Sequence, residues 1–274
     1  MLLLLAINAA VMLALPATLA WYATRRLGGE WRLVLLGAAA FIASQLVHVP
    51  FNAVMLPWLP QQTGPDAWVT WVFLGLSAGL CEESARWLAL RFGVQSPRWR
   101  DAFTTGAGHG GVEAAILGGI ATLSFLFAVA LEDPRAAAAL PDNVRTVLTT
   151  QLEPVRHALW VIPLGAVERA GALSFHVAAS VVVARSVRGA WWWLPVAIVW
   201  HAVMDSGAIA LVATYGFVPA EGFVLLNAVL AWGVIVGLRE PPAARPVEPT
   251  HIAPPPVRRS LDPNSPAADA SRYE

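Results

Sequence analysis

Residues 102–130 read AFTTGAGHGGVEAAILGGIATLSFLFAVA, and this stretch decides the fold class. Because an α-helix rises about 1.5 Å per residue, a helix of this length extends about 44 Å, more than the roughly 30 Å hydrocarbon core of a bilayer. The ionisable side chains within it are His109 and Glu113. The stretch therefore predicts a membrane-spanning helix that carries two polar groups into the bilayer.

Further apolar stretches flank this one on both sides. The chain of 274 residues is 57% hydrophobic and 13% charged, whereas soluble domains carry roughly 25% charged residues. We predict an all-α, polytopic transmembrane helical bundle of about seven spans over residues 1–238, followed by a disordered tail rich in Pro, Ala and Arg over 239–274. We expect the first stretch to be retained as a helix rather than cleaved. The other six spans are predicted at 2–22, 32–56, 67–90, 158–185, 191–214 and 221–238.

The distribution of arginine predicts the orientation of these spans. All 18 basic residues are arginine, and most of them follow the first, third, fifth and seventh stretches. The alternate loops contain Arg135, Arg145 and Arg156. Because positively charged loops face the cytoplasm, we predict an external amino terminus and a cytoplasmic carboxyl terminus. The expected location is a bacterial cytoplasmic (inner) membrane, and the zero net charge gives no indication of nucleic-acid binding.

Four predicted spans carry ionisable side chains far from their ends. Counted from the arginines at the predicted cytoplasmic edge, the histidines and Glu83 all lie roughly 12–20 Å deep. Ionisable groups in a bilayer are costly and indicate function by default, so a shared depth predicts one polar cluster inside the bundle. The residues are Glu82, Glu83, Arg86, His109, Glu113, Glu168, Arg169, His176, His201 and Asp205.

The predicted cluster contains more acidic than basic groups. Arg86 and Arg169 are its arginines, and they are outnumbered by its carboxyl groups. Uncompensated negative charge is costly in a medium of low dielectric constant, so something must offset it. Protonated carboxyl groups, protonated histidines or a bound divalent cation would each do so, and the residues alone leave these three explanations open.

Some of these residues also have a purely structural interpretation. A structural ion pair between Arg86 and Glu83 within one span is as well supported as a catalytic role. For Glu168 and Arg169, we favour structural pairing with other helices over a catalytic role. Outside the cluster, a polar stripe at 45, 48 and 52 favours hydrogen bonding between helices. The small residues around His109 favour close helix approach or space for a substrate; they are Gly106, Gly108, Gly110 and Gly111.

Three short motifs resemble those of the YhfC family of intramembrane peptidases, which is related to PrsW and the CAAX protease/ABI superfamily. The first appears as EESAR at 82–86, one residue shorter than the superfamily form. The second appears as HGGVE at 109–113, with Phe103 displaced from the usual offset, and the third as HAVMD at 201–205. The resemblance covers roughly residues 30–238.

This resemblance implies an intramembrane protease in which a glutamate activates water for attack on a peptide carbonyl. Glu82 would be the general base, and Glu83 would be held by Arg86. His109 and His201 would polarise the water or the carbonyl, and Asp205 would orient them. The full candidate catalytic set is Glu82, Glu83, Arg86, His109, Glu113, His176, His201 and Asp205.

The sequence leaves the cofactor and the function class partly open. A metal-free mechanism of glutamic type is favoured, and the alternative is a divalent metal such as zinc, held by His109, His176 and His201. The expected partner is a membrane-protein or membrane-bound peptide substrate within the lipid bilayer. Two alternative functions remain open. The protein could be a proton- or metal-coupled transporter, in which the polar stripe at 45–52 would form part of the transport path, or a non-catalytic membrane scaffold.

Overall fold

The computed structural model describes residues 1–61 and 63–240, and these residues form helices joined by short connections. This confirms the prediction of an all-α fold. The predicted tail lies outside the described residues from 241 onward. The long helices are α1 (Leu2–Arg25), α2 (Trp31–Met55), α3 (Ala67–Gly93), α4 (Trp99–Glu132), α7 (Leu164–Val187), α8 (Trp193–Tyr215) and α9 (Phe217–Gly237). The short ones are η1 (Leu56–Trp58), α5 (Pro134–Ala139), α6 (Asp142–His157) and η2 (Leu159–Val161).

Six segments of the described chain are long and apolar enough to cross a membrane. The helix α3 is not among them, although its 27 residues would extend about 40 Å. The charged side chains of Glu82, Glu83 and Arg86 lower its mean hydropathy. The predicted count of seven spans and the predicted orientation therefore stay predictions. The six segments are Leu2–Arg25, Trp31–Trp58, Trp99–Glu132, Leu159–Val187, Trp193–Tyr215 and Phe217–Gly237.

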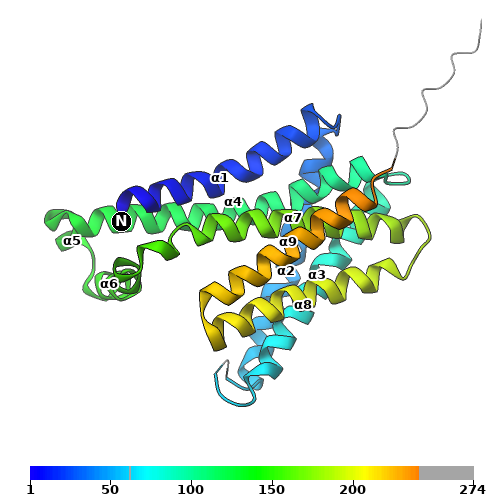
Figure 1. The fold of residues 1–274 in the computed structure, drawn as a ribbon. Helices are drawn as coiled ribbons and strands as arrows, with labels where there is room; N and C mark the ends of the chain where they lie inside the picture. The colour runs from blue at the N-terminus through cyan, green and yellow to red at the C-terminus, as the bar shows by residue number, and fades with distance from the viewer. Residues whose placement is uncertain (62, 241–274) are drawn as a thin grey trace, which may run out of the picture. The chain divides into compact units, whose positions relative to one another are not determined.

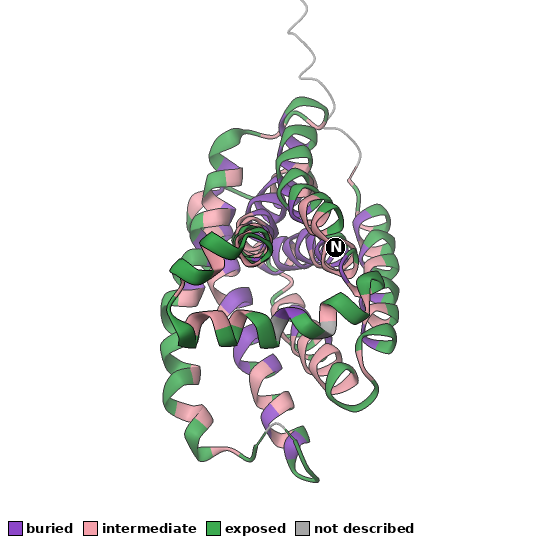
Figure 2. Ribbon diagram, turned by 90° about the vertical axis from the view of Figure 1, so that its left-hand side faces the viewer, coloured by how far each residue is buried: buried purple, intermediate pink, exposed green. Residues whose placement is uncertain are grey.

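Helix α7 is the most enclosed of the long helices. It packs against α1, α3, α4, α8 and α9, and α4 runs beside it on one side (Figure 1). In its most apolar window 72% of the residues are buried, against 17–28% in the other five candidate spans. Buried residues gather on the inner helices, and exposed ones lie along the outer faces (Figure 2). The side chains of Arg169 and His176 on α7 are therefore shielded by protein.

The outer faces of the bundle are rich in large apolar side chains. Leu35, Trp58 and Phe92 are among many that are mostly exposed. A soluble protein rarely exposes a continuous apolar surface of this kind, whereas a membrane protein presents one to lipid. The exposed faces therefore agree with an integral membrane protein.

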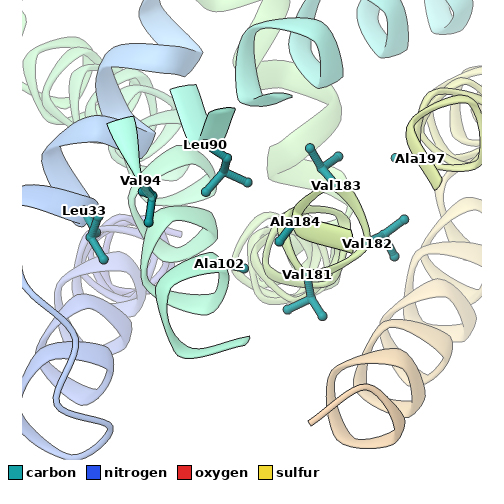
Figure 3. Packing of buried hydrophobic residues seen from close by; sticks show 9 residues of the cluster. All are labelled: Leu33, Leu90, Val94, Ala102, Val181, Val182, Val183, Ala184 and Ala197. Atoms are coloured by element: carbon teal, nitrogen blue, oxygen red, sulfur yellow. The ribbon is translucent and has the colours of Figure 1, made fainter. Parts of the chain in front are cut away.

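One buried apolar cluster fixes the helices next to the predicted polar residues (Figure 3). Leu90 follows Arg86 by one helical turn on α3, and Ala197 precedes His201 by one turn on α8. Packing of this cluster therefore fixes how α3 and α8 are aligned along their axes, and so brings their polar side chains to the same level in the bundle. Its members are Leu33, Leu90, Val94, Ala102, Val181, Val182, Val183, Ala184 and Ala197.

The glycines around His109 bring three helices into close contact. A Cβ atom on Gly108 would lie 2.0 Å from the carbonyl oxygen of Val34 on α2. On the neighbouring face of α4, a Cβ on Gly110 would lie 2.8 Å from the Cβ of His176 on α7. Of the two roles considered for these glycines, the structure supports close helix packing.

We expect Gly108→Ala to lower the free energy of unfolding by about 1–3 kcal/mol, because α2 and α4 must separate to admit the methyl group. Thermal unfolding of the purified protein in detergent measures this change. Gly119→Ala is the matched control, since a Cβ at Gly119 on the same helix meets nothing within 4 Å. An equal loss of stability in both variants would contradict the contact-based explanation.

The segment between α4 and α7 contains two short helices that are not candidate spans. Figure 1 shows α6 nearly end-on, so it runs across the direction of α4 and α7. Polar residues of α6 pair locally, as Arg145 does with Asp142, and its Leu152 is buried.

Candidate active site

Arg86 lies at the centre of the polar cluster, and its side chain has no exposed surface. Its Nη1 donates to both carboxylate oxygens of Glu83 at 2.8 Å, which the three-residue spacing on α3 permits. Its Nη2 donates to Nδ1 of His176 on α7 at 2.9 Å. Arg86 therefore neutralises Glu83 and joins α3 to α7.

Glu82 has different partners from its neighbour in the sequence. Its Oε1 accepts a hydrogen bond from Nε2 of Gln45 on α2 at 2.9 Å. Its Oε2 lies 3.2 Å from Nε2 of His109 on α4 and 3.9 Å from Nε2 of His201 on α8. Within the described part of the chain no arginine forms an ion pair with this buried carboxylate. Glu82 is therefore a carboxylate whose neighbours can all be neutral.

His176 lies between Arg86 and a second group of charges. Its Nε2 is 2.5 Å from Oε2 of Glu113, whose Oε1 accepts from Nη1 of Arg169 at 2.6 Å. The other end of that guanidinium donates to Glu168 at 2.5 Å. Because an ionised carboxylate can only accept, Nε2 of His176 carries the hydrogen and Nδ1 accepts from Arg86. Arg169 thus makes the interhelical pair with α4 that its sequence setting favoured.

His201 connects Glu83 to the other carboxylates. Its Nδ1 is 2.7 Å from Oε1 of Glu83, and its Nε2 is 3.5 Å from Oδ2 of Asp205, one turn along α8. The ring of Phe175 packs edge-on against it, with ring centroids 5.0 Å apart. Contacts on two sides fix the direction in which Nε2 points.

A small cavity gives access to this cluster. Its volume is about 100 Å³, enough for several water molecules. The side chains of Glu168 and Asp205 are 45% and 38% exposed, so the cavity opens on their side of the bundle. The cavity therefore has room for water beside buried carboxylates and imidazoles. Its lining residues are Glu82, Glu113, Glu168, Arg169, Ala172, Phe175, His176, His201, Met204, Asp205, Ala208 and Val224.

The structure brings all eight residues of the candidate catalytic set into this one cluster, as the depth argument predicted. Sequence reasoning missed several of their neighbours, including Phe175 and Gln45. Phe175 was not singled out, and nothing in its sequence setting marks it. Gln45 was assigned to a structural stripe, although its amide contacts Glu82. Its depth on α2, compared with that of Glu82 on α3, was a signal that could have identified it.

Part of the cluster has the composition of a metal site. Ligand atoms of Glu82, His109 and His176 lie within 4.8 Å of one another, and all three residues are buried. Two histidines with one glutamate is a donor set found in zinc peptidases. Nδ1 of His109 is buried without a hydrogen-bond partner among the described residues, so this imidazole is free to change its tautomer. The residues present therefore fit a zinc-class ion.

The other contacts of these histidines resemble those of metal-binding imidazoles. Ligating histidines usually donate their second nitrogen to a carboxylate, as His176 does to Glu113. His201, whose Nδ1 faces Glu83, has the same arrangement. A cation bound at Nδ1 of His176 would take the place of the hydrogen bond from Arg86. These observations support the metal-dependent alternative that the sequence left open.

A helical membrane bundle with buried glutamates and histidines around a central cavity has the fold and the chemical groups of a membrane-embedded hydrolase. Comparison with known families agrees, since the family model described as YhfC intramembrane metalloprotease matches residues 11–225. The chain belongs to the YhfC family, and it is accordingly a membrane protease.

The chain is also similar to a curated protein of Bacillus subtilis (strain 168), described as uncharacterized membrane protein YhfC. The two are 27% identical over 193 residues, which cover 67% of this chain and 74% of that protein. No solved structure matches the chain. The similarity to a membrane protein confirms the expectation of an integral membrane protein.

Proposed function

We propose that the protein hydrolyses a peptide bond of a membrane-associated protein, with Glu82 as the base that activates water. The observation that carries this proposal is the contrast between two adjacent buried carboxylates. Glu83 is bound at both oxygens by Arg86, whereas Glu82 has an amide and two imidazoles as neighbours. A carboxylate without a cationic partner is the better proton acceptor, because no arginine stabilises its ionised form.

The other residues of the cluster have supporting roles in this proposal. Arg86 holds Glu83, which in turn orients His201 through Nδ1. Nε2 of His201 then points between Glu82 and Asp205, where it can pass a proton or hold a carbonyl oxygen. Glu113 and Arg169 fix His176 in the opposite wall. His176 and His201, which line the cavity, thus each have a second contact that fixes the orientation of the imidazole ring.

The proposal includes a zinc-class ion that His109 and His176 would hold, whereas His201 keeps the proton-transfer or carbonyl-binding role given above. Such an ion would act as a Lewis acid that increases the acidity of water and polarises the peptide carbonyl. Glu82 lies within reach of the same ligand atoms, so it has two possible roles, base or ligand. We assign it the role of base, because no arginine among the described residues pairs with its carboxylate, whose Oε2 remains free to accept a proton.

Further elements of the proposal concern the setting. The substrate is a membrane protein or a membrane-bound peptide that reaches the cavity from the side of Glu168 and Asp205. The enzyme resides in the bacterial inner membrane with its amino terminus outside, as the arginine distribution favours.

The test compares new protein amino termini in membranes that contain the wild type or Glu82→Gln. Termini that depend on the wild type are expected, and they would identify both substrates and cleaved bonds. Glu153→Gln is the matched control, because this carboxylate on α6 is 57% exposed and is not one of the residues that line the cavity. Identical termini from wild type and a folded Glu82→Gln protein would contradict the proposal.

A further inference from the structure

A continuous chain of side-chain hydrogen bonds leads from Glu82 away from the cavity. Gln45 Nε2 is 2.9 Å from Oε1 of Glu82, and Gln45 Oε1 is 3.4 Å from Nδ1 of His48. Nε2 of His48 is 2.9 Å from Nδ2 of Asn52 and 3.1 Å from Oγ of Ser77. Ser77 Oγ is in turn 3.0 Å from Oδ1 of Asn52. These side chains occupy one face of α2 and the facing surface of α3.

Glu82, at one end of this series of hydrogen bonds, determines which group donates and which accepts in each of them. An ionised Glu82 can only accept, so the Gln45 amide must present its NH₂ to it and its carbonyl oxygen to His48. Nδ1 of His48 must then donate, which leaves Nε2 as the acceptor in the neutral ring. Asn52 supplies a donor at that position. Every hydrogen bond between Asn52 and Glu82 therefore points toward the carboxylate.

This direction has a consequence for Glu82. With Oε1 held by Gln45, the other oxygen of the carboxylate faces His109 and His201. If His48 carried its hydrogen on Nε2, Nδ1 would face the carbonyl oxygen of Gln45 without a hydrogen between them. The amide would then turn over and present oxygen to Glu82. The tautomer of His48 and the orientation of Glu82 are therefore linked through Gln45.

We propose that Gln45 and His48 are positioning residues for Glu82. Asn52 and Ser77 fix the His48 tautomer, His48 fixes the Gln45 amide, and Gln45 holds the carboxylate in the orientation that receives a proton from water. This inference rests on the proposed role of Glu82 as base. It also gives a function to the polar stripe of α2, beyond holding two helices together.

The test uses the full-length protein in phosphatidylethanolamine/phosphatidylglycerol vesicles. The substrate is a synthetic peptide that contains a bond identified in the comparison of amino termini. We expect Gln45→Leu to lower kcat about 10–100-fold, the usual effect of removing such an outer partner, with KM changed less than two-fold. We expect His48→Leu to lower kcat about ten-fold. His48→Asn, whose amide can donate near the Nδ1 position, should recover most of that loss.

A double-variant comparison separates this role from a general structural effect. If His48 acts through Gln45, the double variant Gln45→Leu/His48→Leu should have the kcat of Gln45→Leu alone. Thr70→Val is the matched control on α3, because it removes the part-buried hydrogen bond from Thr70 to the carbonyl of Pro60 and leaves the hydrogen bonds between Asn52 and Glu82 in place. Its kcat should equal that of the wild type.

The outcomes distinguish this inference from the proposed function. Multiplicative losses in the double variant, or a Gln45→Leu protein with wild-type kcat, would overturn the positioning role while leaving Glu82 as base. An equal fall of kcat in Thr70→Val would also overturn it. A wild type that produces no new termini would instead overturn the proposed function, and with it the positioning role, which rests on Glu82 as base.

Discussion

Arg86→Met is expected to cost the protein about 3–5 kcal/mol of unfolding free energy, because it leaves the carboxylate of Glu83 buried without its cation. The pair has no exposed surface on either side. The same substitution removes the donor to Nδ1 of His176, so a contact between α3 and α7 is lost as well. Chemical or thermal unfolding in detergent measures the change.

Two further variants test this explanation for Arg86. The double variant Glu83→Gln/Arg86→Met should recover much of the loss, since the uncompensated charge is gone. Arg32→Met is the control, because Arg32 pairs with Glu30 on the exposed surface and its loss should have no measurable effect. A double variant as unstable as Arg86→Met would show that lost packing, rather than the buried charge, is responsible.

Glu82→Gln is expected to lower the rate of peptide hydrolysis about 10²–10⁴-fold while bound zinc is retained. The amide keeps the shape of the side chain but cannot take a proton from water. His109→Ala should lose both hydrolysis and zinc, because it removes a proposed ligand of the ion. Zinc per protein molecule, measured by elemental analysis after purification, distinguishes the two variants.

Two outcomes would change the assignment of roles. Loss of zinc from Glu82→Gln would show that this carboxylate is a ligand and that another group is the base. A wild type that hydrolyses peptide with no bound metal would restore the metal-free mechanism that the sequence favoured. His157→Ala is the control for both measurements, since His157 on α6 is 78% exposed and pairs with Glu153.

Much of the fold followed from the apolar stretches and the arginines between them. The stretch around His109 predicted a helix over 102–130, and the structure has α4 over Trp99–Glu132. Hydropathy predicts such helix boundaries because apolar residues give way to polar ones where a helix leaves the lipid and enters water. The convergence of four polar helices also followed from sequence, because depth can be counted in residues from the nearest arginine.

The partners within the site did not follow from the sequence. Depth fixes the height of a side chain but not the rotation of its helix, so the pairing of Arg86 with His176 could not be foreseen. For Gln45 the depth was informative and went unused, but depth alone does not show that its amide faces Glu82. The glycines were more ambiguous still. The Gly110–His176 approach depends on which helix lies beside α4, and hydropathy carries no such information.

The charges of α3 also have a consequence for biosynthesis. Each charged residue at the centre of a helix opposes entry from the translocon into lipid by about 2.5–3.5 kcal/mol. α3 carries Glu82, Glu83 and Arg86, and their partners His176 and His201 leave the ribosome roughly ninety to one hundred and twenty residues later. We expect α3 to remain beside the translocon, or under an insertase, until α7 and α8 arrive. If α3 spans the membrane, as the sequence predicts, its commitment to the bilayer would then be a late, cooperative event of synthesis.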